Sequence, residues 1–221
     1  MYELLIVAGF GWFSLKAFDL HQKNADAELP QKMSERISNL WKVVHQGIKD
    51  NRLLRAEKAL LTILKIDEKN AAAYNRLGIL YAKQKEYKDA IDCFEIATGI
   101  EASASSLHNL GLIYYETENF ERAVIAFEHA LELDDTMAAR HIALAKALEH
   151  VGNEKLMLEH LEKAADLEPT KESYILLAKG YRQMGKEDQA DITEDKIKRL
   201  GSKKIPKKKI MKIRRPKRVV L

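Results

Sequence analysis

Hydrophobic residues recur at helical spacing after Pro30, and no segment there alternates hydrophobic and polar residues as a strand would. The sequence also repeats over a longer distance. The segment from Tyr74, YNRLGILY, aligns with the segment from Leu107, LHNLGLIY, at an offset of 33 residues. Downstream, AIDCFEIA from Ala90 aligns with AVIAFEHA from Ala123 at the same offset. A fixed period of this length predicts a stacked-repeat fold.

The aligned segments pair a helix carrying Leu, a small residue and Tyr with a helix carrying Ala, Phe and Ala, which resembles the tetratricopeptide repeat family. The resemblance implies an all-α fold, a right-handed α-solenoid of about five helix-turn-helix repeats. The repeat domain is expected over residues 37–201, after a linker and the start of the first repeat helix at 21–36. The terminal units depart from the pattern at Val44, Gly47 and Glu194. The expected units span about 37–70, 71–103, 104–137, 138–170 and 171–204.

Close packing of two antiparallel helices explains the pattern physically. A small residue such as Gly78 lets the helix backbones approach, and a ring such as that of Phe94 fills the space between units. Turn signals between the paired helices fall at Asn119, Gly152-Asn153 and Gly185-Lys186. These residues are therefore predicted to be structural.

The first twenty residues differ from the rest of the chain, because residues 4–15 contain no charge. We interpret residues 1–20 as a hydrophobic segment that forms a single membrane anchor. Lys23, Lys32 and Arg36 follow this segment and no Lys or Arg precedes it, which predicts a single-pass membrane protein whose body faces the cytoplasm. Two alternatives are a cleaved signal peptide and a hydrophobic helix packed on the end of the solenoid.

Charge is concentrated at the other end of the chain. Residues 202–221 hold ten basic residues and no acid, whereas the preceding residues hold 27 basic and 33 acidic ones. The tail is predicted to be disordered when free and to contact an anionic membrane surface. Binding to nucleic-acid phosphate and a merely solubilising role are alternatives. The basic residues are Lys203, Lys204, Lys207, Lys208, Lys209, Lys212, Arg214, Arg215, Lys217 and Arg218.

The chain shows no pattern of catalytic chemistry. It lacks an HExxH zinc motif, a glycine-rich phosphate loop and a GxSxG elbow. Cys93 is predicted to be a buried structural thiol, and His129, His150 and His160, which each follow a Glu, are predicted to lie on solvated faces. We therefore predict a protein that is not an enzyme and has no cofactor, no metal and no small-molecule substrate.

The resemblance also implies a groove lined by the first helix of each unit, which binds a protein or peptide ligand. Five basic residues against two acids among the groove positions favour an extended segment with acidic or C-terminal carboxylate character. The predicted function is a membrane-anchored protein-interaction scaffold. The alternatives are a soluble nucleic-acid or ribosome-associated adaptor, and a cell-envelope assembly factor with its body outside the cytoplasm. The candidate groove residues are Trp41, His45, Lys49, Asn75, Lys83, His108, Asn109, Tyr115, Lys146, Lys179 and Arg182.

Overall fold

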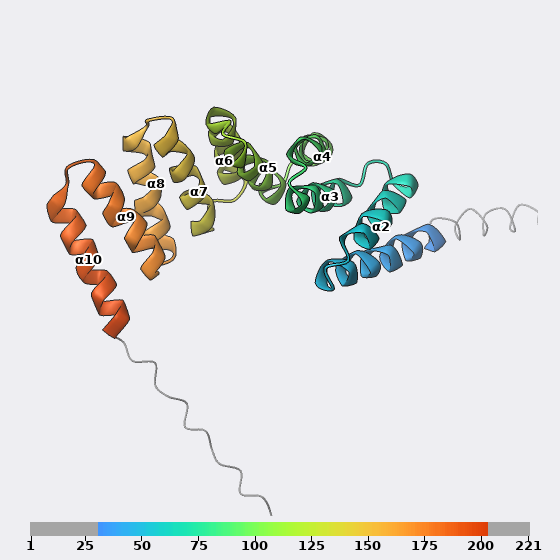
Figure 1. Ribbon diagram of the computed structural model, residues 1–221, viewed down its shortest axis with the longest axis horizontal. Helices are drawn as coiled ribbons and strands as arrows, with labels where there is room; N and C mark the ends of the chain where they lie inside the picture. Colours follow the sequence, from blue (N-terminus) through green and yellow to red (C-terminus); the bar gives the residue numbers. More distant parts are fainter. Residues whose placement is uncertain (1–30, 203–221) are drawn as a thin grey trace, which may run out of the picture. The chain divides into compact units, whose positions relative to one another are not determined.

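The structure, a computed structural model, describes residues 31–202, and these residues form helices joined by short turns, without a strand (Figure 1). They divide into two compact units, the first ending at Asp135 and the second beginning at Thr136. The first unit holds a helix over residues 31–49, α2 (Leu53–Ile66), α3 (Ala71–Gln84), α4 (Tyr87–Ile100), α5 (Ala104–Glu116) and α6 (Phe120–Leu133). The second unit holds α7 (Ala138–His150), α8 (Glu154–Leu167), α9 (Lys171–Gln183) and α10 (Glu187–Ser202).

Consecutive helices pack in pairs within each unit. The pairs are α3 with α4 and α5 with α6 in the first unit, and α7 with α8 and α9 with α10 in the second. The turns inside these pairs are only a few residues long, which forces each pair into a helical hairpin. The predicted all-α fold of stacked helix-turn-helix repeats is thus confirmed over residues 31–202.

Short polar side chains mark where several helices begin. The Asn70 side chain accepts a hydrogen bond from the Ala73 amide at 2.9 Å and so caps α3. Ser103 and Ser106 cap α5 reciprocally, each hydroxyl accepting the other residue's backbone amide. These bonds satisfy amides that the helix itself leaves without partners.

The turn inside each of these hairpins contains one residue in the left-handed region. These residues are Lys85, Glu118, Gly152 and Gly185, with φ of 64°, 60°, 76° and 69°. Glycine adopts this conformation without steric cost, whereas Lys and Glu incur about 1 kcal/mol. The second unit therefore uses glycine at the turns where the first unit tolerates strain.

Glycines in α3 and α5 face phenylalanine rings of the following helix. A Cβ atom added to Gly78 would lie 2.8 Å from the Phe94 ring, and one added to Gly111 would lie 2.6 Å from the Phe127 ring. Both rings are only 1% exposed. Because a contact below 3 Å cannot persist without movement, the rings sit where only a missing side chain leaves room.

A tyrosine-to-glutamate hydrogen bond joins neighbouring hairpins within each unit. Tyr114 on α5 donates to Glu95 on α4 at 2.5 Å, and Tyr181 on α9 donates to Glu162 on α8 at 2.8 Å. Burial and this bond raise the pKa of Tyr181 to about 12, so its hydroxyl stays a donor at neutral pH. The two pairs are equivalent in the repeat, since both span 19 residues.

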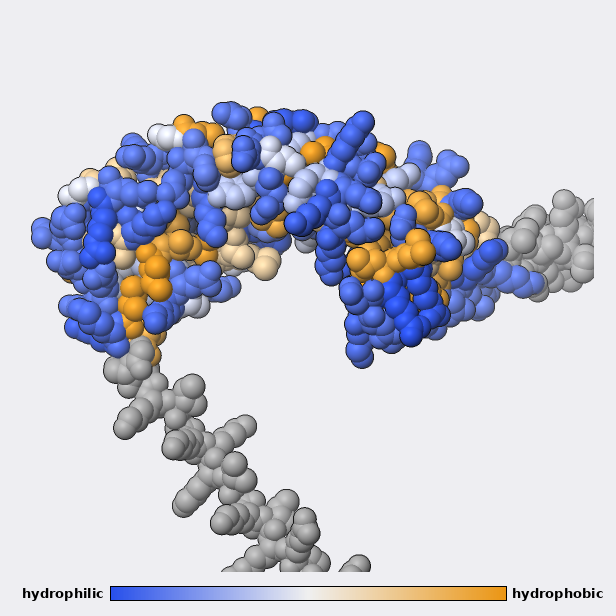
Figure 2. All heavy atoms as spheres, in the orientation of Figure 1, coloured by the Kyte–Doolittle hydropathy of each residue, from blue (hydrophilic) through white to orange (hydrophobic). Residues whose placement is uncertain are grey.

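The prediction of a single-pass membrane protein is wrong for the helices that the structure describes. No helix within residues 31–202 is long and apolar enough to cross a membrane. The labelled helices have 13 to 16 residues, and polar or charged residues lie between their buried ones, as in α2, α5 and α8. Most of the surface visible in Figure 2 is accordingly hydrophilic. The predicted anchor at residues 1–20 lies outside the described residues, as does the predicted basic tail at 202–221 except for Ser202, which ends α10.

The contact between Gly111 and Phe127 predicts an opposite outcome for two glycine-to-alanine substitutions. Gly111→Ala should lower the free energy of unfolding by about 1–2 kcal/mol, because overpacking outweighs the better helix propensity of alanine. Gly99→Ala should raise it by about 0.5–1 kcal/mol, since nothing lies within 4 Å of that position in α4. Urea unfolding followed by circular dichroism measures both. Equal stabilisation by the two substitutions would show that the glycine–ring approach is not a constraint.

Candidate functional site

All eleven predicted groove residues lie on the first helix of a helix pair. The helix over residues 31–49 carries Trp41, His45 and Lys49, α3 carries Asn75 and Lys83, and α5 carries His108, Asn109 and Tyr115; α7 carries Lys146, and α9 carries Lys179 and Arg182. Two of these side chains form a hydrogen bond with each other. Others pack against buried rings or form ion pairs with acids. The prediction that they bind a partner stays a prediction.

Asn75 and Asn109 are brought together across neighbouring hairpins. The Asn109 Nδ2 donates a hydrogen bond to Asn75 Oδ1 at 3.1 Å, and both side chains are partly buried. This bond uses the carbonyl group of Asn75 and one N–H of Asn109. The pair therefore retains the NH₂ group of Asn75 as a donor and the carbonyl oxygen of Asn109 as an acceptor.

A small cavity of about 220 Å³ opens beside this pair. Its walls come from the start of α3, the end of α4 and the start of α5, and small side chains leave the space open. One carboxylate and no cation line it. The lining residues are Ala71, Ala72, Asn75, Ala97, Glu101, Ser103 and Ser106.

The aromatic candidates pack against the body of their own unit. The His108 ring lies 5.4 Å from the Phe127 ring, and the Tyr115 ring meets Phe120 edge-on at the same distance between centroids. Trp41 packs on buried hydrophobic side chains of the first unit, with the His45 ring 5.9 Å away on the same helix. These contacts fix the rings in place and leave part of each accessible.

The basic candidates on α9 are paired with acids. Lys179 Nζ lies 2.9 Å from Glu149 Oε1, and the hydrogen bond from Lys179 is the main cause that lowers the pKa of Glu149. Arg182 lies 2.7 Å from Glu194 Oε1 and within 4.0 Å of Asp191. The expected basic character of the groove is therefore not carried by these two residues in the second unit.

Two histidines on α7 and α8 meet inside the second unit. His141 Nδ1 lies 2.9 Å from His160 Nδ1, and the rings are stacked with centroids 5.2 Å apart. His141 is buried and His160 is half-buried, so the prediction that His160 lies on a solvated face is wrong. The residue separation of 19 between the two rings reflects the helix pairing, which single-residue patterns do not reveal.

The remaining titratable groups give no sign of catalytic or metal chemistry in the part of the chain that the structure describes. No group of three or more His, Cys, Asp or Glu side chains there could hold a metal ion. Cys93 is 7% exposed, and burial, followed by the nearby Asp89 and Asp92, raises the pKa of its thiol to about 11. A thiol that remains protonated at neutral pH is a poor nucleophile.

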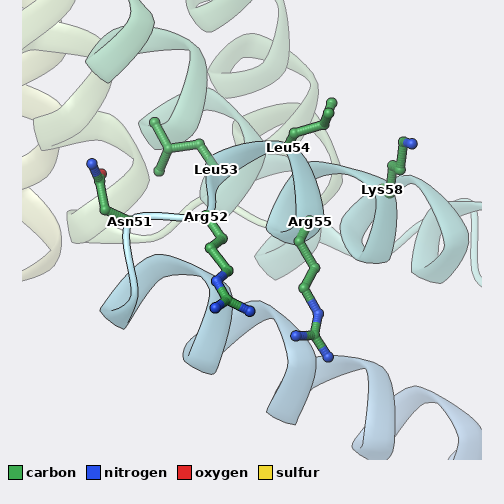
Figure 3. A pocket seen from close by; sticks show the side chains of 6 residues that line it. All are labelled: Asn51, Arg52, Leu53, Leu54, Arg55 and Lys58. Atoms are coloured by element: carbon green, nitrogen blue, oxygen red, sulfur yellow. The ribbon is translucent and has the colours of Figure 1, made fainter.

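Sequence reasoning missed a basic pocket of about 600 Å³ at the start of α2. Figure 3 shows the Arg52 and Arg55 side chains extending side by side toward the helix over residues 31–49, and Leu54 and Lys58 on the opposite side of α2. The remaining lining residues are Asn51 and Leu53. The repeat pattern could not reveal this pocket, because none of these side chains belongs to the repeating set.

Comparison with known proteins supports the predicted repeats. Residues 70–136 match a model of the tetratricopeptide repeat family. No curated protein matches the chain.

Solved structures show the same fold. A crystal structure of MamA protein is 20% identical, with a TM-score of 0.67 over 74% of this chain and 91% of that one. MamA 41-end from Desulfovibrio magneticus RS-1 is 14% identical, with a TM-score of 0.68 over 75% and 95%. YrrB, described as a TPR protein with an unusual peptide-binding site, is 21% identical, with a TM-score of 0.62 over 71% and 82%. At these identities the likeness shows the fold alone.

The histidine pair predicts that acid destabilises the second unit. Burial, and then His141, lower the pKa of His160, so the native state binds fewer protons than the unfolded chain as the pH falls below the ordinary histidine value of 6.5. This contribution to stability is complete above that pH and is lost below it. The nearby Glu159 opposes the shift and Lys163 reinforces it.

Urea unfolding between pH 7.5 and 5 measures this effect. The His160→Gln protein should lose less stability on acidification than the wild type, because its side chain cannot be protonated. His129→Gln removes an exposed histidine from α6 and serves as the matched control, with an acid response like that of the wild type. Identical responses in all three proteins would contradict the role of the pair.

Proposed function

We propose that this chain is a non-enzymatic scaffold that binds an extended segment of a partner protein on the face shared by α3 and α5. The observation that carries the proposal is the hydrogen-bonded pair Asn75 and Asn109. Its remaining donor and acceptor complement the carbonyl and N–H groups that one peptide unit presents. The side-chain amides thus offer a partner backbone the pairing that a strand edge would offer.

The surroundings of the pair support a peptide rather than a small molecule. The adjacent cavity, at about 220 Å³, is smaller than the pockets of about 300–1,000 Å³ that usually hold drug-sized ligands. It suits a single side chain of a segment whose backbone lies on Asn75 and Asn109. His108, Tyr115 and Lys83 flank the pair along α3 and α5 and would contact neighbouring residues of such a segment.

The partner's side chains are not required to be acidic at this face. Asn75 and Asn109 are neutral, and the only charged residue that lines the adjacent cavity is the acid Glu101. Backbone hydrogen bonds would supply affinity, and the cavity would select a side chain. YrrB, which has the same fold and whose description names a peptide-binding site, gives independent support for this class of function.

The test is a selection of peptides from a randomised library on the full-length protein. Peptides obtained in this way should lose about tenfold in affinity for the Asn75→Ala/Asn109→Ala protein, since each lost hydrogen bond is worth about 0.5–1.5 kcal/mol. Asn119→Ala is the matched control, because Asn119 is an exposed asparagine at the α5–α6 turn of the same unit. Fluorescence anisotropy gives the affinities.

Thermal unfolding of each variant shows that the fold is retained. Peptides that bind the double variant as tightly as the wild type would place recognition elsewhere. Failure to select any peptide above the level of an unrelated helical protein would remove the proposal.

A further inference from the structure

All the charged residues that line the pocket at the start of α2 are basic. Arg52, Arg55 and Lys58 line it, no acid does, and all three side chains are exposed. Arg52 and Arg55, three residues apart with Cβ atoms about 5–6 Å apart, extend side by side, whereas Lys58 lies on the opposite side of α2 (Figure 3). Like charges at this distance repel each other, and a bound anionic group would relieve that repulsion.

Nearby acids are engaged with other side chains. The carboxylate of Asp50 accepts hydrogen bonds from Gln46 at 2.9 Å, and Glu57, the single acid of α2, accepts from Tyr81 at 3.5 Å. Among residues 31–202, carboxylates lie within 4.0 Å of Arg122, Lys179, Arg182 and Lys198. The structure shows no such pair for the α2 pocket cations within this described stretch.

The pocket lies in a basic region of an otherwise acidic repeat domain. Residues 31–66 carry eight Lys and Arg against three Asp and Glu, whereas residues 67–202 carry 17 against 26. A positive region of this kind attracts an acidic partner and raises its rate of association. The positive charge is therefore a property of the whole segment over residues 31–66 and not of three side chains alone.

The same pocket is also apolar. Leu54 is 64% exposed, the largest exposed fraction among the described large hydrophobic side chains, and Leu53 lines the pocket beside it. The pocket thus presents two arginines on one side of α2 and an exposed leucine on the other, which fits a ligand that carries both carboxylates and hydrophobic side chains. No aromatic residue lines the pocket on which a nucleic-acid base could stack. A protein segment is therefore favoured over a nucleic acid.

We propose that the α2 pocket binds an acidic protein segment that carries hydrophobic residues between its carboxylates. In an extended segment, alternate residues are about 6.6 Å apart, which suits the spacing of Arg52 and Arg55 along the helix. Because successive side chains of an extended segment point to opposite sides, a segment that runs along α2 between these groups would turn its acids toward Arg52 and Arg55 and its intervening hydrophobic side chain toward Leu54 on the other side (Figure 3). This site is separate from the Asn75 and Asn109 face and does not depend on it.

The test uses full-length protein and a fluorescein-labelled peptide, Ser-Glu-Leu-Glu-Leu-Glu-Ser, at about 0.15 M salt. Binding should weaken about fivefold or more in Arg52→Gln/Arg55→Gln, because each exposed charge contact is worth up to about 1 kcal/mol. Lys69→Gln/Lys88→Gln removes the same charge from exposed positions of the same unit and should change affinity less than twofold. The peptide with Gln in place of Glu should not bind.

The hydrophobic requirement has its own pair of variants. Leu54→Ser should weaken binding, whereas Ile125→Ser, at an exposed position on α6, should not. A single-stranded oligonucleotide that competes for the site while Leu54→Ser has no effect on the peptide would overturn the assignment to a protein segment. If Lys69→Gln/Lys88→Gln weakened binding as much as Arg52→Gln/Arg55→Gln, net charge alone would explain the loss of affinity. That result would overturn the proposed site.

Cross-linking separates the pocket from the basic tail of the full-length chain. A peptide carrying benzoylphenylalanine in place of one leucine should cross-link within residues 51–58. Cross-links confined to residues 202–221 would overturn the proposal. Peptides selected through Asn75 and Asn109 should be unaffected by Arg52→Gln/Arg55→Gln, so the two sites can fail independently.

Discussion

The approach of Gly78 to Phe94, and of Gly111 to Phe127, sets the distance between the paired helices of the first unit. A ring that would lie within 3 Å of any added Cβ leaves no freedom in that distance. Once it is fixed, the positions of the side chains on the remaining faces of α3 and α5 follow from helix geometry. Asn75 and Asn109 meet at 3.1 Å because the two glycine-bearing helices stand side by side in this arrangement.

Acids of the second unit pair with two of the five basic residues that a charge count along the sequence assigns to the groove. Glu149 holds Lys179 and Gln183 on α9, and Glu194 holds Arg182. Each such contact removes a cation from the surface that a count of basic residues assigns to a ligand. Charge available to a partner is therefore better judged from cations that no carboxylate faces, as at the start of α2.

Residue patterns predicted the helix pairs and the small-residue-to-ring packing because both depend on side-chain size at fixed spacing. The turn signals at Gly152 and Gly185 coincide with residues of positive φ, but the signal at Asn119 misses by one residue, because Glu118 has the positive φ there. The patterns did not predict the contact of His141 with His160, which depends on how α7 and α8 face each other. The α2 pocket was missed because its residues lie outside the repeat pattern. Whether its cations are paired with acids also depends on the folded positions of those acids, which the sequence does not give.

The two surfaces proposed for the first unit differ in the physics of recognition. Hydrogen bonds to Asn75 and Asn109 are short-ranged and little affected by salt, whereas attraction to Arg52 and Arg55 reaches farther and is screened at about 8 Å at physiological ionic strength. Because both surfaces belong to one compact unit, a partner that carries an acidic segment and an extended segment on one chain can engage both. Its second contact is then intramolecular, and the effective concentration set by the linker strengthens two individually weak sites. Selectivity of the scaffold would thus come from the spacing of two simple motifs in the partner and not from a single tight pocket.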